Sequence, residues 1–166
     1  MKTLFVLRHA KSSWDDPELK DFARPLAARG LEDIPLMASR FAARGLALDG
    51  IVSSPALRTQ STASLWAGQV GLDASCVTSN PELYFAGAPM LLRAASLFDD
   101  ERDSVMLVGH NPAITDFVND LASLEIENVP TCGLLHFELA IDHWQQIAPG
   151  KATLIDFDYP KRQLPT

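Results

Sequence analysis

The sequence predicts an α/β fold with three layers, α/β/α. We expect a mostly parallel central sheet of about five or six strands, with helices on both faces. Short apolar runs alternate with longer segments of helical pattern along the 166 residues. The runs at 3–7 and 105–108 are almost wholly apolar, which is typical of strands buried on both faces of a parallel sheet. The length suits a single domain over residues 1–166.

The first predicted strand is followed by a polar loop over residues 9–24, which is rich in turn and breaker residues. A helix is predicted from Pro25 to Ala43, with Gly45 as its stop. Gly30 and Pro35 lie inside this helix and predict a kink or a division into two pieces.

The rest of the chain repeats the alternation. Residues 48–54 form the second predicted strand, and Ser54 and Pro55 are expected to cap and open a helix that ends near Gly71. A short strand at 75–79, a loop at 80–89 and a helix from Pro89 are predicted next. A strand at 103–110 follows, and then a helix that Asn111 caps and that ends near Leu124. The last two predicted strands, at 133–140 and 152–159, form a hairpin or edge pair.

Composition limits the classes of partner. The net charge is −7 and the pI about 4.9, which argues against a general nucleic-acid or anionic-membrane binder. No apolar stretch approaches the roughly 20 residues that a membrane helix needs, and the N-terminus does not resemble a signal peptide. Cys76 and Cys132 have no metal-ligand spacing and are expected to be buried thiols. We therefore expect a cytoplasmic protein that binds neither nucleic acid nor membranes.

Cationic and imidazole side chains follow three of the predicted strands. Arg8 and His9 follow the first strand, Arg58 lies on the first turn after the second, and His110 ends the strand at 103–110. Ligands of open α/β sheets bind outside the carboxyl ends of the strands, where helix N-termini also offer free N–H groups. Arginine forks match phosphate oxygens well, so we expect a phosphate-binding crevice at this edge.

Each of these residues has an ordinary structural explanation when taken alone, and it is their coincidence at one edge that favours a site. No glycine-rich nucleotide loop competes with this interpretation, and the acids are not clustered in a way that would hold Mg²⁺. We therefore expect no metal or cofactor, and a histidine that can serve as the nucleophile. His136 and His143 lack this context and are expected to be structural or exposed.

Five stretches of the sequence carry a family resemblance. They are LRHAKSSW, ARPLAARG, IVSSPALRTQST, PELYFAG and LVGHNP, in this order between residues 7 and 112. Together they resemble the histidine phosphatase superfamily, which has the phosphoglycerate mutase-like fold, and within it the small SixA-type phosphohistidine phosphatases. The usual opening of the superfamily is Arg-His-Gly, and Ala10 replaces that glycine here.

The resemblance implies a role for each matching residue. His9 would be the nucleophile that takes the phosphoryl group, while Arg8, Arg58 and His110 would hold the phosphate oxygens.

Two further residues match less firmly. Arg24 matches another phosphate-contacting arginine, although a surface cation at a helix start explains it equally well. Glu82 matches the acid that protonates the leaving group, and its alternative is a solvated loop acid.

The resemblance implies a metal-independent phosphatase with a covalent phosphohistidine intermediate. The chain has no room for a large lid, and its longest loop beside the site is residues 10–24 with Trp14 near the middle. An open site favours phosphohistidine on a partner protein as the substrate. The alternatives are a phosphatase for small phosphate esters and a phosphate- or phosphoprotein-binding module without turnover. A mutase is less favoured because no second phosphate cluster is evident, and the sequence leaves the oligomeric state open.

Overall fold

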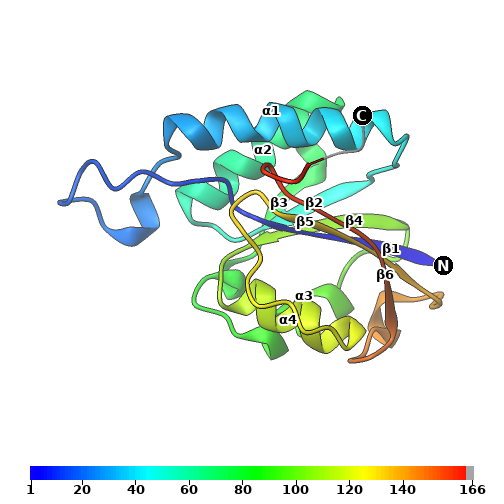
Figure 1. Cartoon of the computed structure of the whole chain (residues 1–166). Helices are drawn as coiled ribbons and strands as arrows, with labels where there is room; N and C mark the ends of the chain where they lie inside the picture. Colours follow the sequence, from blue (N-terminus) through cyan, green and yellow to red (C-terminus); the bar gives the residue numbers. More distant parts are fainter. Residues whose placement is uncertain (164–166) are drawn as a thin grey trace.

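A computed structural model describes residues 1–163, and the last three residues of the predicted domain lie outside the described residues. One six-stranded sheet lies between two layers of helices (Figure 1), which confirms the predicted three-layer fold. The strands are β1 (Lys2–Arg8), β2 (Gly50–Ser53), β3 (Val77–Ser79), β4 (Ser104–Gly109), β5 (Leu134–Leu139) and β6 (Ala152–Asp158). The helices are α1 (Ala28–Ala43), α2 (Leu57–Val70), α3 (Ala88–Ser96) and α4 (Ala113–Ala122).

The strand order is β3-β2-β4-β1-β5-β6. The first four of these strands are parallel, whereas β5 pairs antiparallel with both β1 and β6. The last two strands therefore form the antiparallel edge pair that the sequence predicted. The carboxyl ends of β1, β2 and β4 meet at one edge of the sheet.

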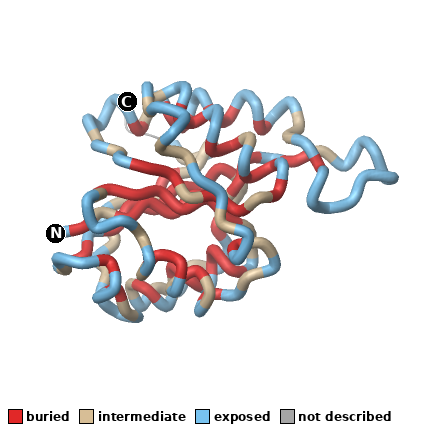
Figure 2. Tube along the Cα trace, turned by 180° about the vertical axis from the view of Figure 1, so that it is seen from behind, coloured by how far each residue is buried: buried red, intermediate tan, exposed pale blue. Residues whose placement is uncertain are grey.

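The core has one apolar cluster on each face of the sheet. On β1, Leu4 and Val6 face the cluster that includes α3 and α4, while Phe5 and Leu7 face the cluster that includes α1 and α2. The central strands are buried along most of their length (Figure 2). A strand covered by helices on both faces needs a continuous apolar run, which explains the pattern at residues 3–7.

The predicted division of the first helix into two pieces is wrong, because α1 is a single element with Pro35 inside it. The helix also starts three residues later than expected. The backbone before it pairs with the loop after β1 instead: Ala27 N–H donates to the Lys11 carbonyl at 2.9 Å, and Ser13 N–H donates to the Pro25 carbonyl at 2.8 Å. Burial of the α1 face around Ile34 outweighs the hydrogen bond that a proline removes.

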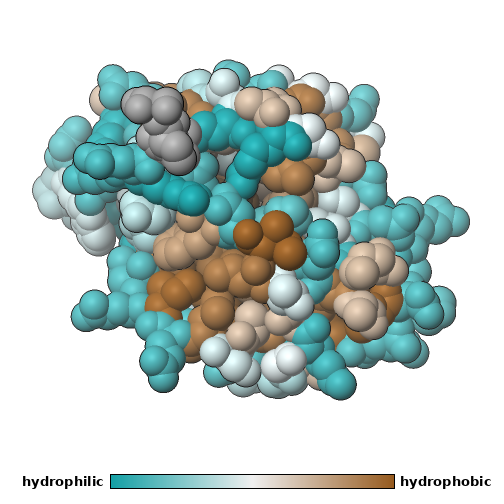
Figure 3. Space-filling model, turned by 45° about the vertical axis from the view of Figure 1, so that its right-hand side comes forward, coloured by the Kyte–Doolittle hydropathy of each residue, from teal (hydrophilic) through white to brown (hydrophobic). Residues whose placement is uncertain are grey.

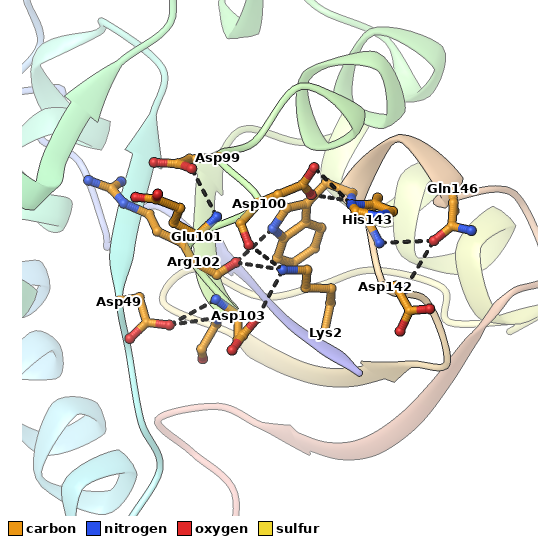
Figure 4. Close-up of polar contacts among 12 residues, drawn as sticks. Lys2, Asp49, Asp99, Asp100, Glu101, Arg102, Asp103, Asp142, His143 and Gln146 are labelled. Carbon is orange, nitrogen blue, oxygen red and sulfur yellow. Dashed lines mark hydrogen bonds and ion pairs between the residues drawn. The ribbon is translucent and has the colours of Figure 1, made fainter.

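A polar network ties the opposite end of the sheet together (Figure 4). Lys2 is almost fully buried, and its Nζ donates to the Asp100 carbonyl at 2.7 Å and to Asp103 Oδ1 at 2.9 Å. His143 is exposed here and contacts Asp100. His136, the second histidine that the sequence placed outside the phosphate-binding crevice, is not part of this network and is buried on β5. Both match the structural or exposed roles expected for them.

The surface beyond these layers is mixed in character. Hydrophilic residues cover most of the face in Figure 3, and hydrophobic residues gather in its lower half, the layer that contains α3 and α4. Within residues 1–163, no helix has the length and apolar character needed to cross a membrane.

Gly30 allows α1 to approach the chain that follows β1. A Cβ at this position would lie 2.3 Å from the Lys11 carbonyl oxygen, whereas a Cβ at Gly68 of α2 would meet nothing within 4 Å. We expect Gly30→Ala to lower the free energy of unfolding by about 1–3 kcal/mol through overpacking. Gly68→Ala should raise it by up to about 1 kcal/mol, because alanine favours a helix. Urea unfolding of both variants checks this pair, and equal effects would contradict it.

Candidate active site

A cleft of about 290 Å³ opens at the carboxyl ends of β1, β2 and β4. Its lining includes four cationic side chains and, among the described residues, a single carboxylate. This charge is concentrated in a chain whose net charge is −7. The lining residues are Arg8, His9, Lys11, Ser12, Trp14, Asp21, Arg24, Arg58, His110, Asn111 and Thr131. The structure thus brings together five of the six residues singled out in the sequence.

His9 lies at the base of this cleft, with only 6% of its surface exposed. Its backbone N–H donates to the Gly109 carbonyl at 3.1 Å, and its own carbonyl accepts from Cys132 N–H at 3.0 Å. The next residue is fixed by α2, because Ala10 N–H donates to Thr62 Oγ1 at 3.1 Å. The histidine is therefore held by the two central strands, the loop before β5 and a helix.

The His9 ring is held in one tautomer. Its Nδ1 lies 2.7 Å from the Ala10 carbonyl oxygen, which can only accept, so Nδ1 carries the proton. Burial lowers the pKa of His9 to about 3, and the neighbouring His110 and Arg8 add to this effect. The ring is therefore neutral near pH 7, and Nε2 has a free lone pair, as a nucleophile requires.

Three nitrogens in the cleft are buried without a hydrogen-bond partner in the described part of the chain. They are Nε of Arg8, Nε of Arg58 and Nδ1 of His110. Buried donors normally find partners, and an anion with several oxygens could satisfy all three. The arginines themselves are oriented by main-chain carbonyls: Arg8 Nη1 donates to Val129 at 3.0 Å, and Arg58 Nη1 donates to Asp21 at 2.8 Å.

His110 faces His9 across the cleft, with ring centroids 5.5 Å apart. Its Nε2 lies 2.7 Å from Ser54 Oγ, and donation from this hydroxyl would place the ring proton on Nδ1. Burial, followed by the charge of Arg58, lowers the pKa of His110 to about 4. The predicted cap role of Ser54 is wrong, because α2 begins at Leu57 and Ser54 serves the histidine instead.

Asn111 occupies a position close to the predicted one. Pro112 precedes α4 as its N-cap residue, and the Asn111 Oδ1 accepts from Thr115 N–H at 3.2 Å. The asparagine therefore satisfies a free N–H of the first helical turn from one position further back than expected.

Sequence reasoning missed Asp21, which joins the cations of the cleft. Its Oδ1 pairs with Arg24 Nη2 at 3.2 Å and its Oδ2 with Arg58 Nη2 at 3.1 Å. The Tyr84 hydroxyl donates to Oδ2 at 2.6 Å, and this hydrogen bond is the largest cause of a pKa near 2 for Asp21. The i, i+3 spacing of Asp21 and Arg24 is the only local signal that could have indicated the pair.

Arg24 is a buried part of the cleft rather than a surface cation, with 6% exposure. Its Nη1 donates to Ser12 Oγ at 2.8 Å, and its guanidinium carbon lies 3.5 Å from the centre of the Trp14 ring. Stacking and hydrogen bonds of this kind fix the plane of the guanidinium.

Glu82 is the predicted site residue that does not line the cleft. It is exposed on a short 3-10 turn, Pro81–Leu83, whose start is capped by Asn80. Tyr84 follows two residues later, and its ring lies 5.7 Å from that of His110. The turn that carries Glu82 therefore borders the cleft, while its carboxylate faces solvent.

Comparisons with known proteins agree with this geometry. The family model of the histidine phosphatase superfamily (branch 1) matches residues 4–84. A SixA protein of Agrobacterium tumefaciens is 30% identical with a TM-score of 0.79, and the match covers 96% of this chain and 98% of that one. The uncharacterized protein Rv1276c of Mycobacterium tuberculosis is 29% identical over 93% of this chain and 100% of its own length.

A second solved structure, of the protein histidine phosphatase SixA complexed with tungstate, has the same TM-score of 0.79. It is 22% identical and covers 95% of this chain and 97% of that one, so it shows likeness of fold alone. The chain belongs to the histidine phosphatase superfamily and is of the SixA type.

The two cleft histidines should make stability depend on pH. Their folded pKa values, about 3 and about 4, lie below the ordinary value near 6.5, so acid favours the unfolded chain. Their contribution to the free energy of unfolding is therefore highest above pH 6.5, where both histidines are neutral in the folded and the unfolded chain, and it decreases as the pH falls. Between pH 7.5 and 5.5, we expect unfolding to become easier by about 1.4 kcal/mol for each histidine.

Urea unfolding of wild type and His110→Gln at these two pH values tests this expectation. The variant should lose about 1.4 kcal/mol less than wild type over the same interval. Identical losses in the two proteins would mean that His110 titrates normally in the folded state.

Proposed function

We propose that this protein is a phosphatase that uses His9 as its nucleophile and removes phosphate from phosphohistidine on a partner protein. The observation that carries the proposal is the fixed, neutral His9 ring at the base of a cationic cleft. Membership of the histidine phosphatase superfamily supports the phosphatase activity, and likeness to SixA proteins supports the choice of phosphohistidine.

In the first step, the Nε2 lone pair of His9 attacks phosphorus. A new N–P bond forms as the bond to the leaving group breaks, and the leaving group departs with its electron pair. The side chains of Arg8, Arg58 and His110 line the cleft and are suited to hold the equatorial oxygens, where charge spreads in the transition state. The Ala10 carbonyl stabilises the proton on Nδ1 as the ring gains positive charge.

In the second step, water attacks the phosphohistidine from the side that the leaving group has vacated. The N–P bond breaks, its electrons return to Nε2, and inorganic phosphate leaves. The same cationic groups stabilise this transition state, because the phosphoryl group passes through the same geometry in reverse.

Two carboxylates are candidates for the proton donor to the leaving group. Asp21 lines the cleft, but its pairing with Tyr84 and Arg58 keeps it ionised, with a pKa near 2, so it is a poor acid near pH 7. Glu82 is not paired in this way within the described residues, and it sits on the turn beside Tyr84. We therefore assign the role of general acid to Glu82, and of general base in the second step.

Phosphate release from histone H4, phosphorylated on histidine with phosphoramidate, tests the nucleophile. With EDTA present, we expect release by wild type and a loss of about 10³-fold or more in His9→Ala, because the variant lacks the attacking imidazole. His143→Ala is the control, since its ring is exposed at the far end of the sheet. Release by wild type from small phosphate esters alone would favour the small-ester alternative, and no turnover at all would favour a binding module.

The role of Glu82 is tested by changing the leaving group. An alkoxide needs a proton as it leaves, whereas imidazole departs more easily. We expect Glu82→Gln to slow hydrolysis of glycerol 2-phosphate by about 10²-fold and that of phosphohistidine by less than tenfold. Glu125→Gln, at an exposed acid just after the C-terminal end of α4 and outside the cleft lining, should change neither rate. Equal losses on both substrates would contradict the assignment.

A further inference from the structure

Four aromatic side chains border the mouth of the cleft and form what we call the aromatic rim: Trp14, Phe22, Tyr84 and Phe85. The Tyr84 ring lies between two of them, with ring centroids 5.1 Å from Phe22 and 4.1 Å from Phe85, while Trp14 stacks on Arg24. Trp14 is 71% exposed and Phe22 is 46% exposed. Large exposed apolar groups gathered at one place typically mark an interaction surface.

Both the exposure and the backbone conformation of Phe85 are energetically unfavourable in the free protein. Its side chain is 87% exposed, and its backbone φ of 58° lies in the left-handed region that bulky residues avoid. The loop that holds it could take glycine or asparagine at this position at lower cost. A bulky residue kept in a strained and solvated position indicates that the ring serves a contact.

The aromatic rim is continuous with the phosphate cleft. Tyr84 contacts the His110 ring and donates to Asp21, and Trp14 stacks on Arg24, so two members touch residues that line the cleft. A polypeptide that carries the phosphate into the cleft can extend over Tyr84 and Phe85, whereas a free phosphorylated amino acid has no neighbouring residues to contact them.

On the two segments that carry the aromatic rim, exposed acids outnumber the exposed lysines Lys11 and Lys20. The loop after β1 projects from the body of the molecule and is exposed over most of its length (Figures 1 and 2). Its tip carries Asp15, Asp16 and Glu18, all exposed, and Glu82 is exposed on the turn before Tyr84. Acids around an apolar rim favour a partner with basic side chains at matching places.

We propose that the aromatic rim docks a protein segment in which phosphohistidine lies between apolar side chains, with lysine or arginine further out. The inference rests on the proposed function, and it adds how the partner is recognised. Phe85 receives an apolar neighbour of the phosphohistidine. Aromatic residues of this kind supply much of the binding energy at protein interfaces.

Three substrates test the proposal: free phosphohistidine, and two phosphohistidine peptides with the same outer lysines but either leucine or serine beside the phosphohistidine. Phe85→Gly removes the ring and relieves the positive φ, so its melting temperature should equal or exceed that of wild type. Leu97→Ala is the matched control, because Leu97 is 70% exposed and lies at the end of α3.

We expect wild type to prefer the leucine peptide over the serine peptide by about tenfold in kcat/KM, which corresponds to about 1.4 kcal/mol. In Phe85→Gly this preference should fall to near one, while kcat/KM for free phosphohistidine stays within about twofold of wild type. Leu97→Ala should keep the full preference.

Other outcomes would overturn the proposal. A preference unchanged in Phe85→Gly would show that the rim does not read the flanking residues, and equal losses on all three substrates would assign Phe85 a structural role. A dimer in sedimentation that Phe85→Gly abolishes would mean that the rim covers a second copy of this chain. Failure of the proposed function is distinct, since wild type would then release no phosphate from free phosphohistidine or from either peptide.

Discussion

The parallel pairing of β1 with β4 is the constraint on which the cleft depends. It aligns Arg8 with Gly109, so that the residues immediately after each strand, His9 and His110, face one another. A slip of one residue would turn every side chain of β1 to the opposite face and bury the wrong set. The fit of Leu4 and Val6 to one helix layer, and of Phe5 and Leu7 to the other, therefore sets the register, and the register sets the distance between the two imidazoles.

Crowding cations and imidazoles at one edge carries an electrostatic cost, and the structure offsets it in three ways. Main-chain carbonyls accept from Arg8 and Arg58, which spreads their charge over fixed dipoles. Asp21 supplies a counter-charge between Arg24 and Arg58. The two histidines lose their protons instead of adding charge, as their lowered pKa values require. The positive charges of the cleft are thus partly compensated in the free protein, and its cationic side chains still outnumber its carboxylate, which suits an anion.

The fold and four of the six candidate site residues were predictable from local patterns, because apolar runs make strands and the residues after parallel strands share an edge. Arg24, which also lines the cleft, was indicated by the family resemblance alone. The remaining features depend on contacts between distant segments. Asp21 meets Arg58 and Tyr84 only through tertiary packing, and Ser54 fits a helix cap until His110 is placed beside it. Pro35 likewise does not divide α1, since packing against the sheet outweighs a local preference.

The position of β1 in the sheet has a consequence for how the chain is made. The strand is synthesised before both of its neighbours, β4 and β5, which lie about 100 and 130 residues further along the chain. Its two hydrogen-bonding edges therefore lack their partner strands until most of the chain has been synthesised. Because such long-range pairings form slowly, the segment that bears the candidate nucleophile is also the one most in need of protection from aggregation during synthesis.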